Sequence, residues 1–221
     1  MEYCSLREAD TWVFDLDNTL YCSSTNLFSQ VSARMTGFIA DFLGVDGDEA
    51  FRVQKKYFRE YGTTLRGLMH HHDIDPYRFL DHVHDVDLGM IGPDPSLNAA
   101  LATLSGRKII FTNASTEHAG RVMNRLGIAE HFEGVFDIAD AGFVPKPEPA
   151  VYLQLVERHK FDPKRSVMVE DMARNLKPAA DLGMTTVWVR TENDWGREGS
   201  DAGYIDHTLD TLSDWLHDLP D

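Results

Sequence analysis

The stretch Trp12-Val13-Phe14-Asp15-Leu16-Asp17-Asn18-Thr19 decides the fold, because three apolar residues run directly into two aspartates separated by one residue. A run that is apolar at every position has no polar face, which is typical of a parallel strand covered by helices on both sides. Comparable runs recur at 108–111, 135–138, 166–169 and 185–189, with helical patterns between them. This alternation predicts an α/β fold with a Rossmann-like parallel sheet flanked by helices.

One interval interrupts the alternation of strands and helices. Helical patterns at 27–43, 48–61, 64–71 and 76–86 follow one another with no strand-like run between them. We therefore expect a core formed by residues 1–21 and 90–221, and an inserted all-helical lobe formed by residues 22–89. A lobe beside the carboxyl ends of parallel strands can close over a ligand bound there.

The remaining helices are expected from their end signals. Ser115 can cap a helix that ends before Gly127, and Pro147 suits the first turn of a helix at 147–159. A further helix is expected at 173–182. A final helix at 209–219 is expected to follow a short strand near Tyr204 and Ile205.

Composition limits the classes of partner. The 221 residues include 36 Asp and Glu against 21 Lys and Arg, a formal net charge of −15, and 43% of the residues are hydrophobic. The hydrophobic content excludes a disordered chain, and the acidity argues against nucleic-acid polymers and anionic membranes as partners. Two cysteines, Cys4 and Cys22, and the lack of an apolar leader predict a reduced, cytoplasmic protein. The oligomeric state is left open.

Acidic residues follow two of the predicted strands. Asp15 and Asp17 follow the first, and Glu170-Asp171 follows the run at 166–169. Carboxylates gathered at one edge of a sheet repel each other unless a cation or a shared proton intervenes, and Mg²⁺ prefers such oxygen ligands. The alternative is that these residues form turns, with Asp171 capping the helix at 173–182.

Three other polar residues are expected at the same edge. Thr112 and Asn113 follow the strand at 108–111 and precede a helix start, where a hydroxyl, an amide and free N–H groups can hold a phosphate. Lys146 lies between two prolines near another helix start and can offer a positive charge. Each residue type is also common in ordinary turns and on surfaces.

The order of these residues resembles the four sequence motifs of the haloacid dehalogenase-like phosphohydrolases, and the helical insertion resembles that superfamily's first-position cap. The resemblance implies that Asp15 is the nucleophile and Asp17 the general acid and base. It implies Mg²⁺ ligands from Asp15, the Asp17 backbone carbonyl and Asp171, with Glu170 acting directly or through a neighbour. It also implies that the transferring phosphoryl group is held by Thr112, the backbone of Asn113 and Lys146.

Within the superfamily, Asp17 favours phosphatase chemistry, because a halide leaving group needs no proton and an alkoxide does. The strings at 14–21, 61–68 and 169–176 are similar to those of the pyrimidine 5′-nucleotidase branch. This likeness implies a nucleoside monophosphate as substrate. The stretch at 62–67 combines a helix break with hydroxyls and a guanidinium, so we expect Thr64 and Arg66 to contact the substrate. A sugar phosphate or another small phosphate ester is the alternative substrate. A phospho-accepting signalling domain is a further alternative, and so is an exposed Arg66 without a role.

The histidines at 70–72, with His82 and His84, allow a Zn²⁺ site to be considered. Three consecutive helical residues point in different directions, whereas helical metal ligands favour a spacing of four residues. We therefore expect a polar helix face here.

Overall fold

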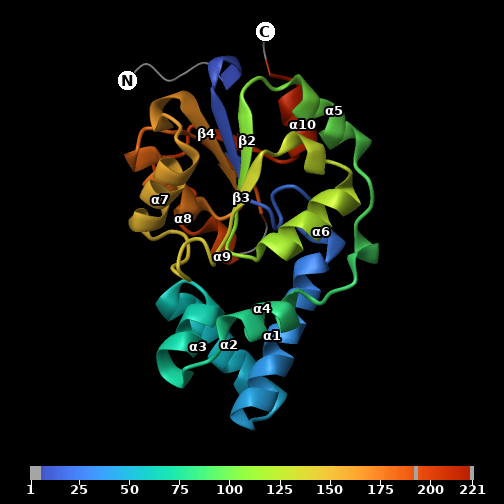
Figure 1. Cartoon of the computed structure of the whole chain (residues 1–221), viewed down its shortest axis with the longest axis vertical. Coiled ribbons are helices and arrows are strands. Elements are labelled where there is room, and N and C mark those ends of the chain that lie inside the picture. The colour runs from blue at the N-terminus through green and yellow to red at the C-terminus, as the bar shows by residue number, and fades with distance from the viewer. Residues whose placement is uncertain (1–5, 192–193, 220–221) are drawn as a thin grey trace.

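A computed structural model describes residues 6–191 and 194–219, and its centre is a six-stranded parallel sheet (Figure 1). The strand order is β3-β2-β1-β4-β5-β6, so the first strand of the chain lies in the middle. This arrangement confirms the expected Rossmann-like α/β fold. The strands are β1 (Thr11–Phe14), β2 (Arg107–Phe111), β3 (Gly134–Phe136), β4 (Ser166–Glu170), β5 (Thr185–Val189) and β6 (His207–Leu209).

The central strands are apolar on both faces because both faces are covered. Trp12 and Phe14 of β1 pack into one hydrophobic cluster, whereas Val13, between them, packs into a second cluster on the other side of the sheet. Phe14 pairs with Ile110 of β2 and with Val169 of β4. This register brings the ends of three neighbouring strands to the same level.

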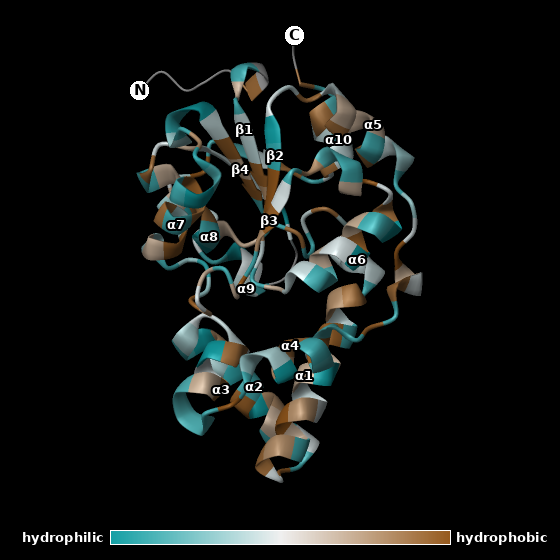
Figure 2. Ribbon diagram, viewed as in Figure 1, coloured by the Kyte–Doolittle hydropathy of each residue, from teal (hydrophilic) through white to brown (hydrophobic). Residues whose placement is uncertain are grey.

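Helices lie on both sides of the sheet (Figure 1), and hydrophobic residues gather in the strands between them (Figure 2). On one side α5 packs against α10, and on the other α7 packs against α8. The core helices are α5 (Pro95–Thr103), α6 (Thr116–Leu126), α7 (Pro149–His159), α8 (Ala173–Asp181), α9 (Asp194–Arg197) and α10 (Leu212–His217). Single 3₁₀ turns lie at Leu6–Glu8, Ser23–Thr25, Leu88–Met90, Ala129–His131 and Pro163–Arg165.

The expected ends of α6 are confirmed, because Ser115 accepts a hydrogen bond from the His118 N–H and Gly127 ends the helix with left-handed backbone angles. Pro147 was expected in the first turn of α7, and this prediction is wrong by two residues. The Glu148 N–H donates to the Pro145 carbonyl in a turn, and Pro149 is the first helical residue. The turn intervenes because the side chain of the neighbouring Lys146 extends into the sheet edge.

The last elements also differ from expectation. The final strand is β6, and Tyr204 lies in the loop before it, where its carbonyl accepts a hydrogen bond from the Thr186 hydroxyl. The last helix begins at Leu212 instead of residue 209. The side chain of Asp206 accepts from both the N–H and the hydroxyl of Thr186, so polar contacts to β5 hold this loop outside the ladder.

Four helices form a lobe beyond the carboxyl ends of the strands (Figure 1). Within it α1 packs against α2 and α4, and α2 packs against α3. We call these four helices the helical lobe; the division of the chain at residues 22 and 89 stays a prediction. None of the described helices combines the length and apolar character that crossing a membrane requires. The lobe helices are α1 (Leu27–Leu43), α2 (Gly47–Tyr61), α3 (Thr64–His72) and α4 (Pro76–His84).

The close packing of α2 on α3 gives a test of the lobe. A Cβ atom added at Gly67 would lie 2.4 Å from the Cβ and Cγ atoms of Tyr57, whereas one added at Gly120 in α6 would meet nothing within 4 Å. Gly67→Ala should therefore lower the free energy of unfolding by about 1–3 kcal/mol through overpacking. Gly120→Ala should raise it by about 0.4–1 kcal/mol. Urea denaturation measures both, and a stabilising Gly67→Ala would contradict this packing.

Candidate active site

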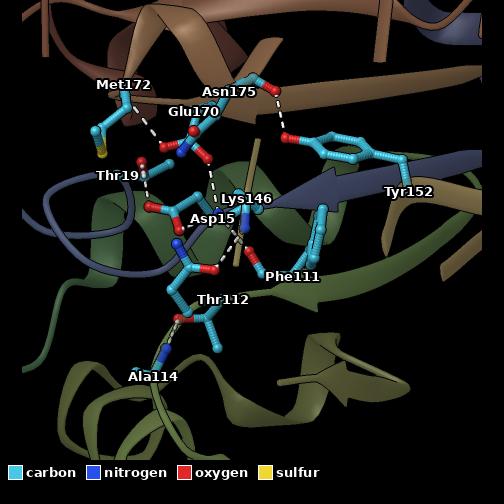
Figure 3. Close-up of polar contacts among 11 residues, drawn as sticks. Asp15, Thr19, Phe111, Thr112, Ala114, Lys146, Tyr152, Glu170, Met172 and Asn175 are labelled. Carbon is cyan, nitrogen blue, oxygen red and sulfur yellow. Dashed lines mark hydrogen bonds and ion pairs between the residues drawn. The ribbon is translucent and has the colours of Figure 1, made fainter. Parts of the chain in front are cut away.

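The polar residues that follow β1, β2 and β4 meet at the carboxyl edge of the sheet (Figure 3). Asp15 follows β1, Thr112 follows β2, and Glu170 and Asp171 stand at the end of β4. The Asp15 N–H donates to the Val169 carbonyl at 2.9 Å, which extends the ladder to the first aspartate. The predicted juxtaposition of these residues is therefore present.

Lys146 reaches this edge from the loop between β3 and α7. Its Nζ donates to Asp15 Oδ1 at 2.7 Å, to Glu170 Oε2 at 2.7 Å and to the Phe111 carbonyl at 2.8 Å (Figure 3). The side chain is 1% exposed. Burial alone would lower the pKa of the Lys146 ammonium, but the two carboxylates outweigh it and hold this pKa above its usual value. Lys146 is therefore a fixed positive charge.

Asp15 is held at both oxygens. Lys146 contacts Oδ1, and the Thr19 hydroxyl donates to Oδ2 at 3.0 Å. Burial and repulsion from Glu170 raise the pKa of Asp15 to about 7, although Lys146 opposes them. A further positive charge would lower this pKa and keep the carboxylate ionised.

Three buried carboxylates lie close together at this edge of the sheet. Asp15, Glu170 and Asp171 offer oxygens that all lie within 4.8 Å of one another. The two oxygens of Glu170 already accept hydrogen bonds, from Lys146 Nζ and from the Met172 N–H. Oδ2 of Asp171 is buried and has no hydrogen-bond partner.

The environment of Asp171 fits a cation. Burial and the neighbouring carboxylates raise the pKa of Asp171 well above its usual value. The alternative role as a helix cap is not observed, because Met172 occupies the N-cap of α8. Three carboxylates against one ammonium leave an excess of negative charge, so these residues fit a hard divalent cation such as Mg²⁺.

Thr112 and Asn113 arrange the loops around Lys146. The Thr112 oxygen accepts a hydrogen bond from the Ala114 N–H at 3.0 Å (Figure 3). Asn113 Oδ1 accepts from the Lys146 N–H at 3.0 Å, which joins the loop after β2 to the loop before α7. Contact of these residues with a phosphate stays a prediction.

Asp17 is bound on one oxygen by two side chains. Oδ1 accepts hydrogen bonds from the Tyr21 hydroxyl at 2.7 Å and from His118 Nε2 at 3.1 Å. Burial raises the pKa of Asp17, but the His118 ring and the Tyr21 hydroxyl favour the ionised form more strongly, so this pKa lies below its usual value. Tyr21 falls within the motif at 14–21, whereas no sequence signal links His118 to an aspartate 101 positions away.

A family model for haloacid dehalogenase-like hydrolases matches residues 9–183. The chain belongs to this family. It is 29% identical over 214 residues to phosphate metabolism protein 8 of Saccharomyces cerevisiae, covering 88% of this chain and 65% of the yeast protein, so it spans under two thirds of that relative. It is 27% identical over 219 residues to glyceraldehyde 3-phosphate phosphatase of Methanocaldococcus jannaschii, covering 91% and 93% of the two chains.

A solved haloacid dehalogenase-like phosphatase from Thermococcus onnurineus shares the fold. Its TM-score is 0.61 at 20% identity, and the match covers 94% of this chain and 96% of that one. At this identity the likeness establishes the fold alone. It agrees with the parallel sheet and helices of this haloacid dehalogenase-like hydrolase.

The two lobe residues expected to contact substrate have different surroundings. Thr64 is 4% exposed, and its hydroxyl donates to the Gln54 carbonyl of α2 at 3.2 Å. This contact gives Thr64 a packing role, and its contact with substrate stays a prediction. Arg66 is partly exposed, and its Nη1 lies 3.1 Å from Oε1 of Glu148, the residue before α7. Arg66 therefore bridges the helical lobe and the core.

Two histidines of the run at 70–72 contact tyrosine hydroxyls of α2. The one group of potential ligands found among residues 6–191 and 194–219 is the carboxylate cluster. His71 and His72 instead contact the hydroxyls of Tyr61 and Tyr57, at 2.7 and 2.8 Å. These contacts agree with the expected polar helix face.

Proposed function

We propose that this haloacid dehalogenase-like hydrolase is a Mg²⁺-dependent phosphomonoesterase that uses Asp15 as its nucleophile. The observation that carries the proposal is the buried Asp15–Lys146 pair, 2.7 Å apart, beside the unpartnered oxygen of Asp171. A buried carboxylate beside an ammonium and a cation site is suited to attack a phosphate, because both positive groups reduce the repulsion between two anions. The phosphatase named among the relatives supports this class of reaction.

The reaction has two halves. In the first, an Asp15 oxygen forms a bond to phosphorus, the bond from phosphorus to the ester oxygen breaks, and Asp17 gives its proton to that oxygen. In the second, water attacks phosphorus, Asp17 takes a proton from the water, and Asp15 leaves as a carboxylate. Inorganic phosphate is released, and both aspartates return to their starting forms.

The remaining residues stabilise charge. Asp15, Asp171 and the backbone carbonyl of Asp17 would hold Mg²⁺. Glu170 would support this site indirectly, because its oxygens accept hydrogen bonds from Lys146 and from the Met172 N–H. When bound, the cation offsets the negative charge of the carboxylates and of the phosphoryl group. Thr112, the backbone of Asn113 and Lys146 would hold the phosphoryl oxygens.

The substrate class that we favour is a pyrimidine nucleoside 5′-monophosphate. The motif strings at 14–21, 61–68 and 169–176 support it. A small sugar-type phosphate is the second candidate, because a relative that matches over nearly its whole length is named a glyceraldehyde 3-phosphate phosphatase. In both cases the partner is a small phosphate ester.

The nucleophile assignment predicts the behaviour of Asp15→Asn. An amide is a poor nucleophile, so the rate of Mg²⁺-dependent hydrolysis of p-nitrophenyl phosphate should fall about 1,000-fold or more in the variant. Its melting temperature should stay near that of wild type. Asp181→Asn, an exposed carboxylate on α8, serves as the matched control. Wild-type-like turnover in Asp15→Asn would refute the assignment. A stable phospho-Asp15 without turnover in the wild type would instead support a signalling domain.

The cation site predicts stabilisation by Mg²⁺ that does not depend on activity. At about 100 times its Kd, Mg²⁺ should add about 2.7 kcal/mol to the free energy of unfolding, which thermal denaturation detects. Asp171→Asn should remove most of this gain, and in EDTA it should be at least as stable as wild type because one repelling buried carboxylate is gone. Asp181→Asn should keep the gain. Equal gains in all three proteins would contradict the site.

Phosphate release from a panel of esters tests the substrate class. UMP and CMP should give the highest kcat/KM, above AMP, glyceraldehyde 3-phosphate and hexose phosphates. Arg66→Ala should raise KM for UMP about 10-fold if the guanidinium contacts the substrate. Arg52→Ala removes an exposed arginine of α2 and should have no effect. Unchanged KM and kcat in Arg66→Ala would remove Arg66 from the site, and a preference for glyceraldehyde 3-phosphate would favour the second candidate.

A further inference from the structure

The carboxylate of Asp17 is held asymmetrically. Both hydrogen bonds that it accepts, from Tyr21 and from His118, end on Oδ1. Among the described residues no hydrogen bond ends on Oδ2. Because an ionised carboxylate only accepts hydrogen bonds, the Tyr21 hydroxyl and His118 Nε2 are both donors. Two donors on one oxygen fix the rotation of the carboxylate group and leave the other oxygen available.

The two donors are themselves fixed. The His118 side chain is fully buried in the first turn of α6, and its backbone N–H donates to the capping Ser115 oxygen at 3.3 Å. Tyr21 is 6% exposed and belongs to the main hydrophobic cluster. Neither ring can turn away from Asp17 without moving the core around it.

A residue of the helical lobe packs against the face of the His118 ring. His84, the last residue of α4, stacks on it with ring centroids 4.4 Å apart and planes 20° apart. Nδ1 of His84 lies 3.1 Å from the Ser115 hydroxyl. Arg121, one turn further along α6, donates to the carbonyls of His84 and Val86 at 3.0 and 2.9 Å. The segment that returns from the lobe is thus held to the helix that carries His118.

We propose that Tyr21 and His118 are positioning residues for Asp17, which hold Oδ1 so that Oδ2 exchanges the proton with the leaving oxygen and later with water. The proposal rests on the proposed function, because it specifies the atom that performs the acid and base steps. In the first step the proton passes from Oδ2 to the ester oxygen as the bond to phosphorus breaks. In the second step Oδ2 takes a proton from the attacking water. Stacking by His84 keeps the donor ring of His118 in its plane.

Leaving-group dependence separates positioning from structural support. An alkoxide needs a proton to leave, whereas p-nitrophenolate leaves without one. Tyr21→Phe and His118→Leu should therefore lower kcat/KM about 10- to 100-fold for an alkyl ester such as UMP or glycerol phosphate. The loss for p-nitrophenyl phosphate should be less than about 3-fold, because the acid step contributes little there. His118→Gln keeps an N–H donor near the position of Nε2 and should restore most of the activity towards the alkyl ester.

Controls keep the two proposals separate. Tyr152→Phe removes another buried hydroxyl, which donates to the Asn175 carbonyl at 2.6 Å, and should not change the ratio of the two esters. Equal losses for both esters in Tyr21→Phe, in an otherwise active enzyme, would overturn the positioning role alone. A wild type that hydrolyses neither ester would overturn the proposed function itself. If His118→Leu does not fold, Tyr21→Phe, which loses a single oxygen, carries the test.

Discussion

The ammonium of Lys146 is the group on which the site depends. It binds Asp15, which lies 131 positions earlier in the chain. It also binds Glu170 and the Phe111 carbonyl in the same buried place. Removal of the ammonium would leave Asp15 and Glu170 as uncompensated buried charges, which is strongly destabilising. The ends of β1, β2 and β4 and the loop before α7 are therefore held together by one cation. The same cluster keeps negative charge in excess, so the divalent cation proposed for this site would offset that excess.

Asp15 and Asp17 show how far the surroundings can move apart the pKa values of two neighbouring carboxyl groups. Burial among carboxylates raises the pKa of Asp15 to about 7, whereas His118 and Tyr21 hold the pKa of Asp17 below its usual value. In the chain alone this order of pKa values is the reverse of what the proposed roles of nucleophile and acid need. A divalent cation beside Asp15 lowers the first pKa, and a phosphate dianion beside Asp17 raises the second. In the proposed reaction, a bound cation and the substrate would therefore bring both aspartates to the protonation states that their roles require.

Sequence patterns predicted the sheet and its polar edge well, because strand ends are local features and the sheet brings them together. The apolar run at 12–14 and the polar residues that follow the predicted strands were sufficient to place this edge. The patterns failed where a distant contact decides the local structure. The side chain of Lys146 reaches Asp15 at the sheet edge, and α7 begins only at Pro149. The contact between His118 and Asp17 follows from packing that no spacing in the sequence reveals.

The stacking of His84 on His118 has a consequence for how this protein can diverge. The charged cluster takes its described side chains from the core, so substitutions on the outward faces of α2 and α3 leave the contacts of this cluster unchanged. The end of α4 lacks that freedom, because a substitution at His84 reaches Asp17 through one ring. Most positions of the lobe can therefore vary without changing the contacts of Asp17, whereas a change at His84 removes the ring that stacks on the donor His118.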